Sequence, residues 1–131
     1  MQEEILNTIK QFEKSGFIKH NNIKIDEVNE EYAKLSVEIS ESSLNPNNTA
    51  HGGLIFGLAD SAMGLAARTT GKNIVTVNAQ IDYIKKGKGK ILYAEAKPLK
   101  IGRTISVYRC EVQDENNNLI ASVTATFYYI N

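Results

Sequence analysis

The 131-residue chain has the composition of a single globular domain, with 42% hydrophobic and 23% charged residues. This length is enough to bury a core without disulfides or structural metals. Fifteen Lys and Arg residues balance fifteen Asp and Glu residues, so the chain has no overall charge with which to attract nucleic acid or an anionic membrane. We therefore expect one domain over residues 1–131 and no nucleic acid partner.

The sequence also lacks signals of export. Its single cysteine, Cys110, excludes an internal disulfide framework. Residues 1–16 are acidic and amphipathic, whereas a signal peptide starts with basic residues and continues with apolar ones. No apolar run reaches the roughly 20 residues that a membrane span requires. We expect a cytoplasmic protein with no membrane partner.

Two kinds of periodicity occur in the first 40 residues. Apolar residues at helical spacing predict an amphipathic helix over 3–14, with Gly16 as its stop. Segments 23–28 and 32–40 instead alternate apolar and polar residues on either side of Asn29. This alternation predicts a β-hairpin.

Residues 52–70 have a different pattern, because apolar side chains occupy nearly every side of the helix that they would form. A helix that is apolar all round is buried. Asp60, Arg68 and the internal glycines argue against a lipid environment. We therefore expect a sheet of the same protein to surround this helix.

Four strands are predicted in the second half of the chain, at 74–84, 90–99, 103–113 and 118–129. Each alternates with period two, and the turns between them are short and rich in Gly or Asn. Short connections imply antiparallel neighbours. An antiparallel sheet of five or six strands that covers one long apolar helix is an α+β architecture. On the strand 74–84, the residues expected to share one face are Val75, Val77, Ala79, Ile81 and Tyr83.

This order of elements resembles the hotdog fold, in which an antiparallel sheet wraps around one long central helix. Residues 49–60, TAHGGLIFGLAD, resemble the signature of hotdog acyl-CoA thioesterases of the phenylacetic-acid-degradation type. The most specific residues are Asn45, His51-Gly52-Gly53 and Asp60; VTVNAQIDYI and KIGRTISVYRCEV are weaker matches. The resemblance spans nearly the whole chain. It implies cofactor-free hydrolysis of acyl-CoA or aryl-CoA thioesters, at sites shared between subunits of a dimer or a dimer of dimers.

Asp60 is the first candidate for a catalytic residue. An ionised carboxylate in an apolar helix costs on the order of several kcal/mol unless it is paired or solvated, so its presence indicates a functional gain. The resemblance implies that Asp60 acts as nucleophile or as general base on water, and a thioester needs only one activated oxygen because thiolate is a good leaving group. Alternatively, Asp60 lies on an exposed strip and only keeps the helix soluble.

Further candidates lie where this helix begins. Unpaired backbone N–H groups at a helix start can hold a developing oxyanion. The resemblance puts the oxyanion donor at Gly52 and a substrate contact at Gly53. It also implies that His51 positions the thioester and that Asn45 assists water or the carbonyl. The alternatives are glycines needed only for the loop-to-helix junction and an ordinary loop histidine.

The spacing of His51 and Asp60 suggests how a site would be assembled. Nine residues, from 51 to 60, are two and a half helical turns, so the two side chains cannot meet along one helix. We expect His51 of one chain to approach Asp60 of another across a two-fold axis. The strand 74–84 would pair with its symmetry mate, because a long unpaired edge is a hazard that proteins normally relieve.

Thr76 aligns with a family hydroxyl that helps to hold the lytic water. We expect it on the polar side of its strand together with Asn78, Gln80 and Asp82. A solvated strand face explains these residues equally well.

Two turns concentrate positive charge. KKGKGK supplies Lys85, Lys86 and two further lysines, and KIGR supplies Lys100 and Arg103. The phosphates of CoA are a natural ligand for Lys85, Lys86 and Arg103. The alternative is that these cations discourage edge-to-edge aggregation.

Other chemistries fit the sequence less well. Ser61 follows Asp60 without the Gly-x-Ser-x-Gly elbow of a serine hydrolase. With only His20, His51 and one cysteine, the chain has no metal-ligand spacing, and we expect Cys110 to be a small buried side chain. Two rival functions remain: a hydroxyacyl-thioester dehydratase, which releases no thiol, and a non-catalytic module that binds acyl thioesters.

Overall fold

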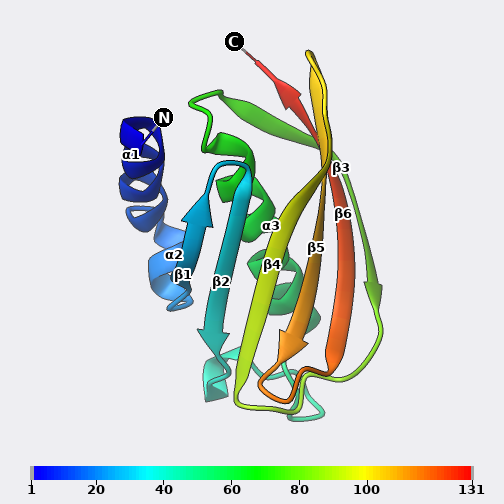
Figure 1. Ribbon diagram of the computed structural model, residues 1–131. Coiled ribbons are helices and arrows are strands. Elements are labelled where there is room, and N and C mark those ends of the chain that lie inside the picture. The colour runs from blue at the N-terminus through cyan, green and yellow to red at the C-terminus, as the bar shows by residue number, and fades with distance from the viewer. Residues whose placement is uncertain (1, 131) are drawn as a thin grey trace.

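The computed structural model describes residues 2–130, in which a six-stranded antiparallel sheet wraps one long helix (Figure 1). The elements in chain order are α1 (Gln2–Glu13), α2 (Gly16–His20), β1 (Lys24–Asn29), β2 (Tyr32–Glu38), η1 (Glu41–Ser43), α3 (Gly52–Arg68), β3 (Ile74–Tyr83), β4 (Ile91–Ile101), β5 (Ile105–Asp114) and β6 (Leu119–Tyr129). The strands lie in the order β1-β2-β4-β5-β6-β3. The predicted α+β architecture is confirmed.

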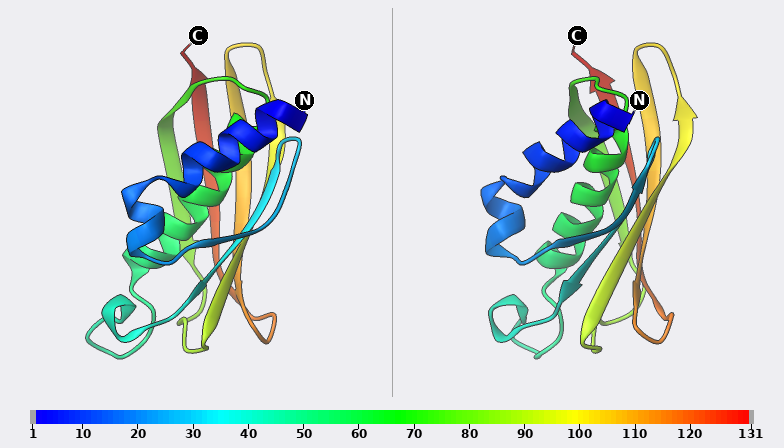
Figure 2. Two further views of the ribbon diagram at one scale, coloured as in Figure 1. Left: turned by 90° about the vertical axis from the view of Figure 1, so that its left-hand side faces the viewer. Right: turned by 60° about the vertical axis from the view of Figure 1, so that its left-hand side comes forward.

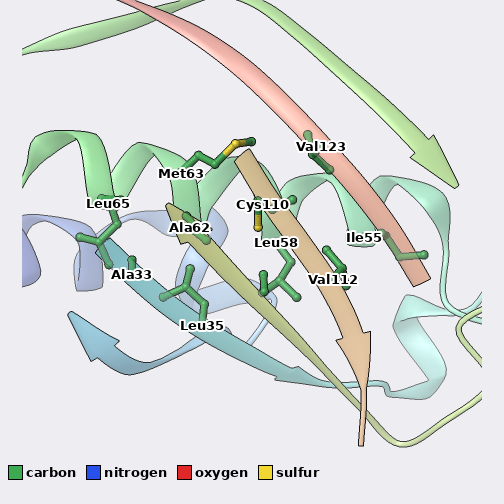
Figure 3. Packing of buried hydrophobic residues seen from close by; sticks show 14 of the residues in the cluster. Ala33, Leu35, Ile55, Leu58, Ala62, Met63, Leu65, Cys110, Val112 and Val123 are labelled. Atoms are coloured by element: carbon green, nitrogen blue, oxygen red, sulfur yellow. The ribbon is translucent and has the colours of Figure 1, made fainter. Parts of the chain in front are cut away.

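Helix α3 fills the concave side of the sheet and is the centre of the core (Figure 2). Leu58, Met63 and Leu65 of this helix are fully buried. Figure 3 shows side chains of α3 pointing toward Leu35 of β2 and toward residues of β5 and β6. Cys110 lies in the same core, and burial raises the pKa of its thiol. The expectation that Cys110 is a small buried side chain is confirmed, and such a thiol is a poor nucleophile.

Helices α1 and α2 form an N-terminal arm, residues 2–20, on the side of α3 that faces away from the sheet (Figure 2). The predicted helix over 3–14 is confirmed as α1. Gly16, expected only as a stop, begins a second short helix after an extended Ser15. Two contacts illustrate how the arm is held against α3. Phe17 packs on Gly57, where an added Cβ would lie 2.7 Å from the ring, and the Thr8 hydroxyl donates to the Arg68 carbonyl at 3.1 Å.

Strand β3 lies at an edge of the sheet and, among the described strands, pairs only with β6. Its register shifts between Thr76 and Asn78, which leaves Val77 as the extra residue of a β-bulge. Opposite residues of an antiparallel pair share a face. Thr76 lies opposite the buried Phe127, whereas Val75 lies opposite the exposed Tyr128.

This bulge corrects two expectations about β3. Val75 lies on the outer face of the sheet, while Ala79 lies opposite the buried Ala125 on the inner face. The predicted single apolar face from Val75 to Tyr83 is therefore wrong, because one extra residue reverses the alternation. For the same reason Thr76 does not share the outer face of Asn78, whose partner across the ladder is Thr126.

Candidate active site

Asp60 lies in the middle of α3, with its side chain half-buried in a cavity of about 300 Å³ between α3, the N-terminal arm and the sheet. Phe12, Ile18 and Phe127 supply apolar walls of this cavity. Burial raises the pKa of the Asp60 carboxyl, and the positive charge of Arg68 opposes that rise. A carboxylate whose pKa is raised toward neutral pH is a better proton acceptor than an ordinary surface carboxylate.

Thr76 lines the same cavity. The bulge at Val77 directs it inward, on the face of Phe127, although period-two alternation predicted the outer, polar side. The structure thus brings Asp60 and Thr76 together from two different elements. Their shared cavity contains a carboxylate and a hydroxyl, the groups that can hold and activate a water molecule.

His51 is the N-cap of α3. Its Nδ1 accepts a hydrogen bond from the Gly53 N–H at 2.8 Å, so the neutral imidazole carries its proton on Nε2. The Gly53 N–H is therefore engaged. Within residues 2–130, the Gly52 N–H donates to no partner. Of the two glycines, Gly52 is the one with a donor free for an oxyanion at the positive end of the helix dipole.

Asn45 braces the loop that leads into α3. Its side-chain Oδ1 accepts from the N–H groups of Asn47 at 2.9 Å and Thr49 at 3.1 Å, and its Nδ2 donates to the Thr49 hydroxyl at 2.9 Å. Both ends of the amide are thus used within the loop. Asn45 also lines a second cavity, of about 280 Å³, together with Gly52.

Tyr83, which was expected only as a strand residue and not at the site, lies at this second cavity. Its hydroxyl donates to the Gly52 carbonyl at 2.9 Å, and a Cβ added to Gly52 would lie 3.2 Å from that hydroxyl oxygen. The signal that could have found it is its place at the end of the edge strand, where an aromatic side chain can reach the helix start.

Lys85 and Lys86 line the second cavity, just beyond β3. Lys85 Nζ also donates to the Asn118 side chain at 3.4 Å. Arg103 lies elsewhere, on the turn between β4 and β5, at the end of the molecule where α3 ends rather than begins (Figure 1). The two basic turns therefore do not form one cluster within a single chain.

The candidate residues fall into two groups. Gly52, Asn45 and the two lysines surround the start of α3, while Asp60 and Thr76 lie in the cavity farther along. Nine residues of helix, from 51 to 60, span about 13 Å at 1.5 Å per residue. Among residues 2–130, no group of three or more His, Cys, Asp or Glu side chains is placed to hold a metal ion.

Comparison with known proteins links this geometry to a family. The thioesterase superfamily matches residues 47–121, more than half of the chain. The chain belongs to the thioesterase superfamily. A putative esterase of Archaeoglobus fulgidus is 38% identical over 82% of this chain and 71% of its own length. The acyl-coenzyme A thioesterase PaaI of Escherichia coli is 28% identical over 88% of this chain and 83% of its own length.

Solved structures of thioesterases have the same fold. The E. coli PaaI structure superposes with a TM-score of 0.93 at 24% identity, covering 98% of this chain and 95% of that protein. A Streptococcus pneumoniae thioesterase protein, solved with coenzyme A, superposes with a TM-score of 0.87 at 26% identity, covering 94% of this chain and 97% of that protein. The hotdog thioesterase fold expected from the sequence is confirmed.

The part of this thioesterase that matches the superfamily includes all of α3 and β3 but not the N-terminal arm. The arm nevertheless lines the Asp60 cavity, through residues such as Thr8 and Gln11. Sequence reasoning missed this contribution because the contact joins segments more than 40 residues apart. None of the described helices has the length and apolarity needed to cross a membrane.

Proposed function

We propose that this thioesterase hydrolyses acyl-CoA or aryl-CoA thioesters, with Asp60 as the catalytic carboxylate. The observation that carries the proposal is the half-buried Asp60 side chain, in a cavity that it shares with the Thr76 hydroxyl. The E. coli relative named an acyl-coenzyme A thioesterase and the relative solved with coenzyme A support this substrate class.

The chemistry follows from the groups available. With Asp60 as general base, the carboxylate takes a proton from water as the water oxygen attacks the thioester carbonyl, and Thr76 holds that water. The Gly52 N–H stabilises the negative oxygen that forms, while Asn45 and His51 keep the helix start and the carbonyl in place. The C–S bond then breaks, releasing the carboxylic acid and the CoA thiolate, which takes up a proton. With Asp60 as nucleophile, its attack on the carbonyl breaks the C–S bond, releases the CoA thiolate and leaves a mixed anhydride, which water cleaves to the free acid and the Asp60 carboxylate.

We further propose that each site contains residues of two chains, in a dimer or a dimer of dimers. The separation of the two groups along α3, about 13 Å between residues 51 and 60, and the open edge of β3 support this arrangement. Pairing of two β3 edges around a two-fold axis would make one continuous sheet. The substrate would contact Lys85, Lys86 and Gly53 near the start of α3. Arg103 would contact it from the turn between β4 and β5.

A thiol-release assay over a panel of acyl-CoA and aryl-CoA esters tests the function. We expect hydrolysis of at least one ester by the native protein, and a loss of at least about 100-fold in Asp60→Asn, which keeps the shape but removes the basic oxygen. Glu38→Gln, a change of an exposed acid on β2, away from the edge proposed to pair, is the matched control and should hydrolyse normally.

The rival functions predict other results. A dehydratase would consume hydroxyacyl thioesters without releasing thiol, and a binding module would bind esters without consuming them. Undiminished thiol release by a folded Asp60→Asn protein would exclude Asp60 as the catalytic group.

A cytoplasmic location is part of the same proposal and is supported by the buried, unpaired Cys110.

A further inference from the structure

Asp60, Gly64 and Arg68 form one stripe along α3. Residues four apart on a helix lie on nearly the same side, and these three line the same cavity. Helical side chains also lean toward the helix N-terminus, so the long side chain of Arg68 is directed back along the stripe toward Asp60.

Gly64 is the residue that lets the guanidinium lie in this position. Arg68 Nη1 donates to the Gly64 carbonyl at 3.2 Å. A Cβ added at Gly64 would lie only 2.9 Å from the same Nη1 atom. The eight residues from 60 to 68 span about 12 Å of helix, and a guanidinium placed over Gly64 covers about half of that distance.

The surroundings make this charge pair distinctive. Asp60 and Arg68 are the two charged side chains among the residues that line the cavity. The other elements packed around Asp60 present uncharged side chains: Thr8, Gln11, Phe12 and Ser15 from the arm, Thr76 from β3 and Phe127 from β6. On its far side, Arg68 borders a groove that includes Glu4 and Lys72, so these two charges need their own controls.

We propose that Arg68 is a positioning residue for Asp60: its guanidinium, folded back over Gly64, keeps the carboxylate charged inside a cavity that disfavours the charge. Burial and Arg68 act in opposite directions on the pKa of the Asp60 carboxyl, as expected of a desolvated acid beside a cation. This inference rests on the proposed function, in which the charged form of Asp60 is the active one.

The test compares Arg68→Gln, which keeps a polar, hydrogen-bonding side chain but is shorter and loses the charge, with Arg68→Lys, which keeps the charge. For Arg68→Gln we expect kcat/KM within about twofold of the native value at pH 8, and a ratio of rates at pH 6 to pH 8 at least about threefold below the native ratio. The sign follows from the carboxylate: without the cation its pKa rises, so a smaller fraction is ionised at pH 6. Arg68→Lys should restore most of the native ratio.

Two further variants separate charge placement from packing. Gly64→Ala should displace the guanidinium and lower the same ratio while Arg68 is still present. Glu4→Gln and Lys72→Gln change charges on the other side of Arg68 and should leave the ratio unchanged. An equal loss of rate at all pH values in Arg68→Gln, or the same shift in Glu4→Gln, would overturn the proposal.

A readout without substrate keeps the inference independent of the reaction. The 13C resonance of the Asp60 carboxyl, assigned by its absence in Asp60→Asn, should titrate at higher pH in Arg68→Gln than in the native protein. An unchanged titration overturns the role of Arg68 even in an active enzyme. If the titration is shifted in a protein that hydrolyses no acyl-CoA, the electrostatic effect of Arg68 on Asp60 is supported and the proposed function is contradicted.

Discussion

The Nδ1 atom of His51 accepts a hydrogen bond of 2.8 Å from the backbone N–H of Gly53 and thereby caps the central helix. This contact gives His51 a structural task in addition to the positioning role proposed for it. It also uses the donor of Gly53 and leaves that of Gly52 for the substrate.

The two tasks of His51 can be separated by substitution. His51→Ala removes the cap and should lower the free energy of unfolding by about 1 kcal/mol, as well as turnover. His51→Asn supplies another good N-cap side chain, so it should recover most of the stability but not the turnover. Urea denaturation and thiol release, measured on the same samples, check both quantities. Full activity of His51→Asn would show that the histidine acts only as a helix cap.

Gly52→Ala should lower turnover by about tenfold or more, while the protein stays folded. The new Cβ would lie 3.2 Å from the Tyr83 hydroxyl oxygen, beside the N–H that a carbonyl must approach. Complete loss of an oxyanion donor raises the activation barrier by roughly 3 to 4 kcal/mol. Crowding by the new Cβ should remove part of this stabilisation. Gly16→Ala is the matched control, because nothing lies within 4 Å of its added Cβ. Native turnover in Gly52→Ala would make this glycine purely structural.

Asp60→Asn should stabilise the fold at neutral pH. Burial raises the pKa of the folded Asp60 carboxyl above its unfolded value, so the native state binds more protons and stability falls as pH rises between the two values. The uncharged amide avoids that loss. We expect the midpoint of thermal unfolding at pH 7 to rise by roughly 1–4 °C, with a smaller gain at pH 4, where more of the native carboxyl is protonated. Calorimetry at both pH values checks this, and a variant less stable than the native protein at pH 7 would contradict it.

Replacing Lys85 and Lys86 together by Gln should raise KM for a CoA ester by about threefold to tenfold, with kcat nearly unchanged. The effect should shrink in high salt, since exposed charges are screened. A truncated thioester without phosphates is the comparison substrate and should show no change. Lys24→Gln with Lys97→Gln removes the same charge from exposed positions elsewhere and serves as the control. Equal effects on both substrates would exclude contact with the phosphates.

Mixed oligomers test the shared site. Inactive His51→Ala and Asp60→Asn chains, mixed and allowed to exchange, should recover part of the native turnover, because a hybrid dimer holds one site with both residues intact. Differently tagged chains, isolated by two affinity steps, provide the hybrids for assay. Hybrids without activity, or a fully active monomer at high dilution, would contradict a site built from two chains.

Much of this molecule could be predicted from periodicity and turns. The buried helix with an acid in it, the antiparallel strands and the hairpin are local patterns, and a sheet around one apolar helix is the architecture that buries them. What escaped prediction depends on long-range contacts. The second helix after Gly16 is only five residues long, and it is held in place by the packing of Phe17 on Gly57.

The candidate site was predictable in its residue types more than in its geometry. Asp60 and the glycines could be named. Tyr83 was missed because its bond to the Gly52 carbonyl joins residues 31 apart, and its place at the end of the edge strand was the one signal that pointed to it. The stripe of Asp60, Gly64 and Arg68 could be predicted from the four-residue spacing on a helix. The sequence does not indicate that the N-terminal arm covers this stripe. The inward direction of Thr76 was not predictable, since the sequence around Val77 alternates apolar and polar residues as it would in a regular strand.

The bulge at Val77 decides which side chain of the edge strand faces Asp60. If Val77 took a regular place in the ladder, with Asn78 onward still paired to β6, Thr76 would rotate to the outer face and Val75 would turn inward. The cavity beside Asp60 would then exchange a hydroxyl for a methyl-bearing side chain, although the sequence of the strand stayed the same. Deleting Val77 would instead remove the extra residue and leave Thr76 opposite Phe127. At this edge of the sheet, then, a register shift of one residue is a change of chemistry and not only of shape.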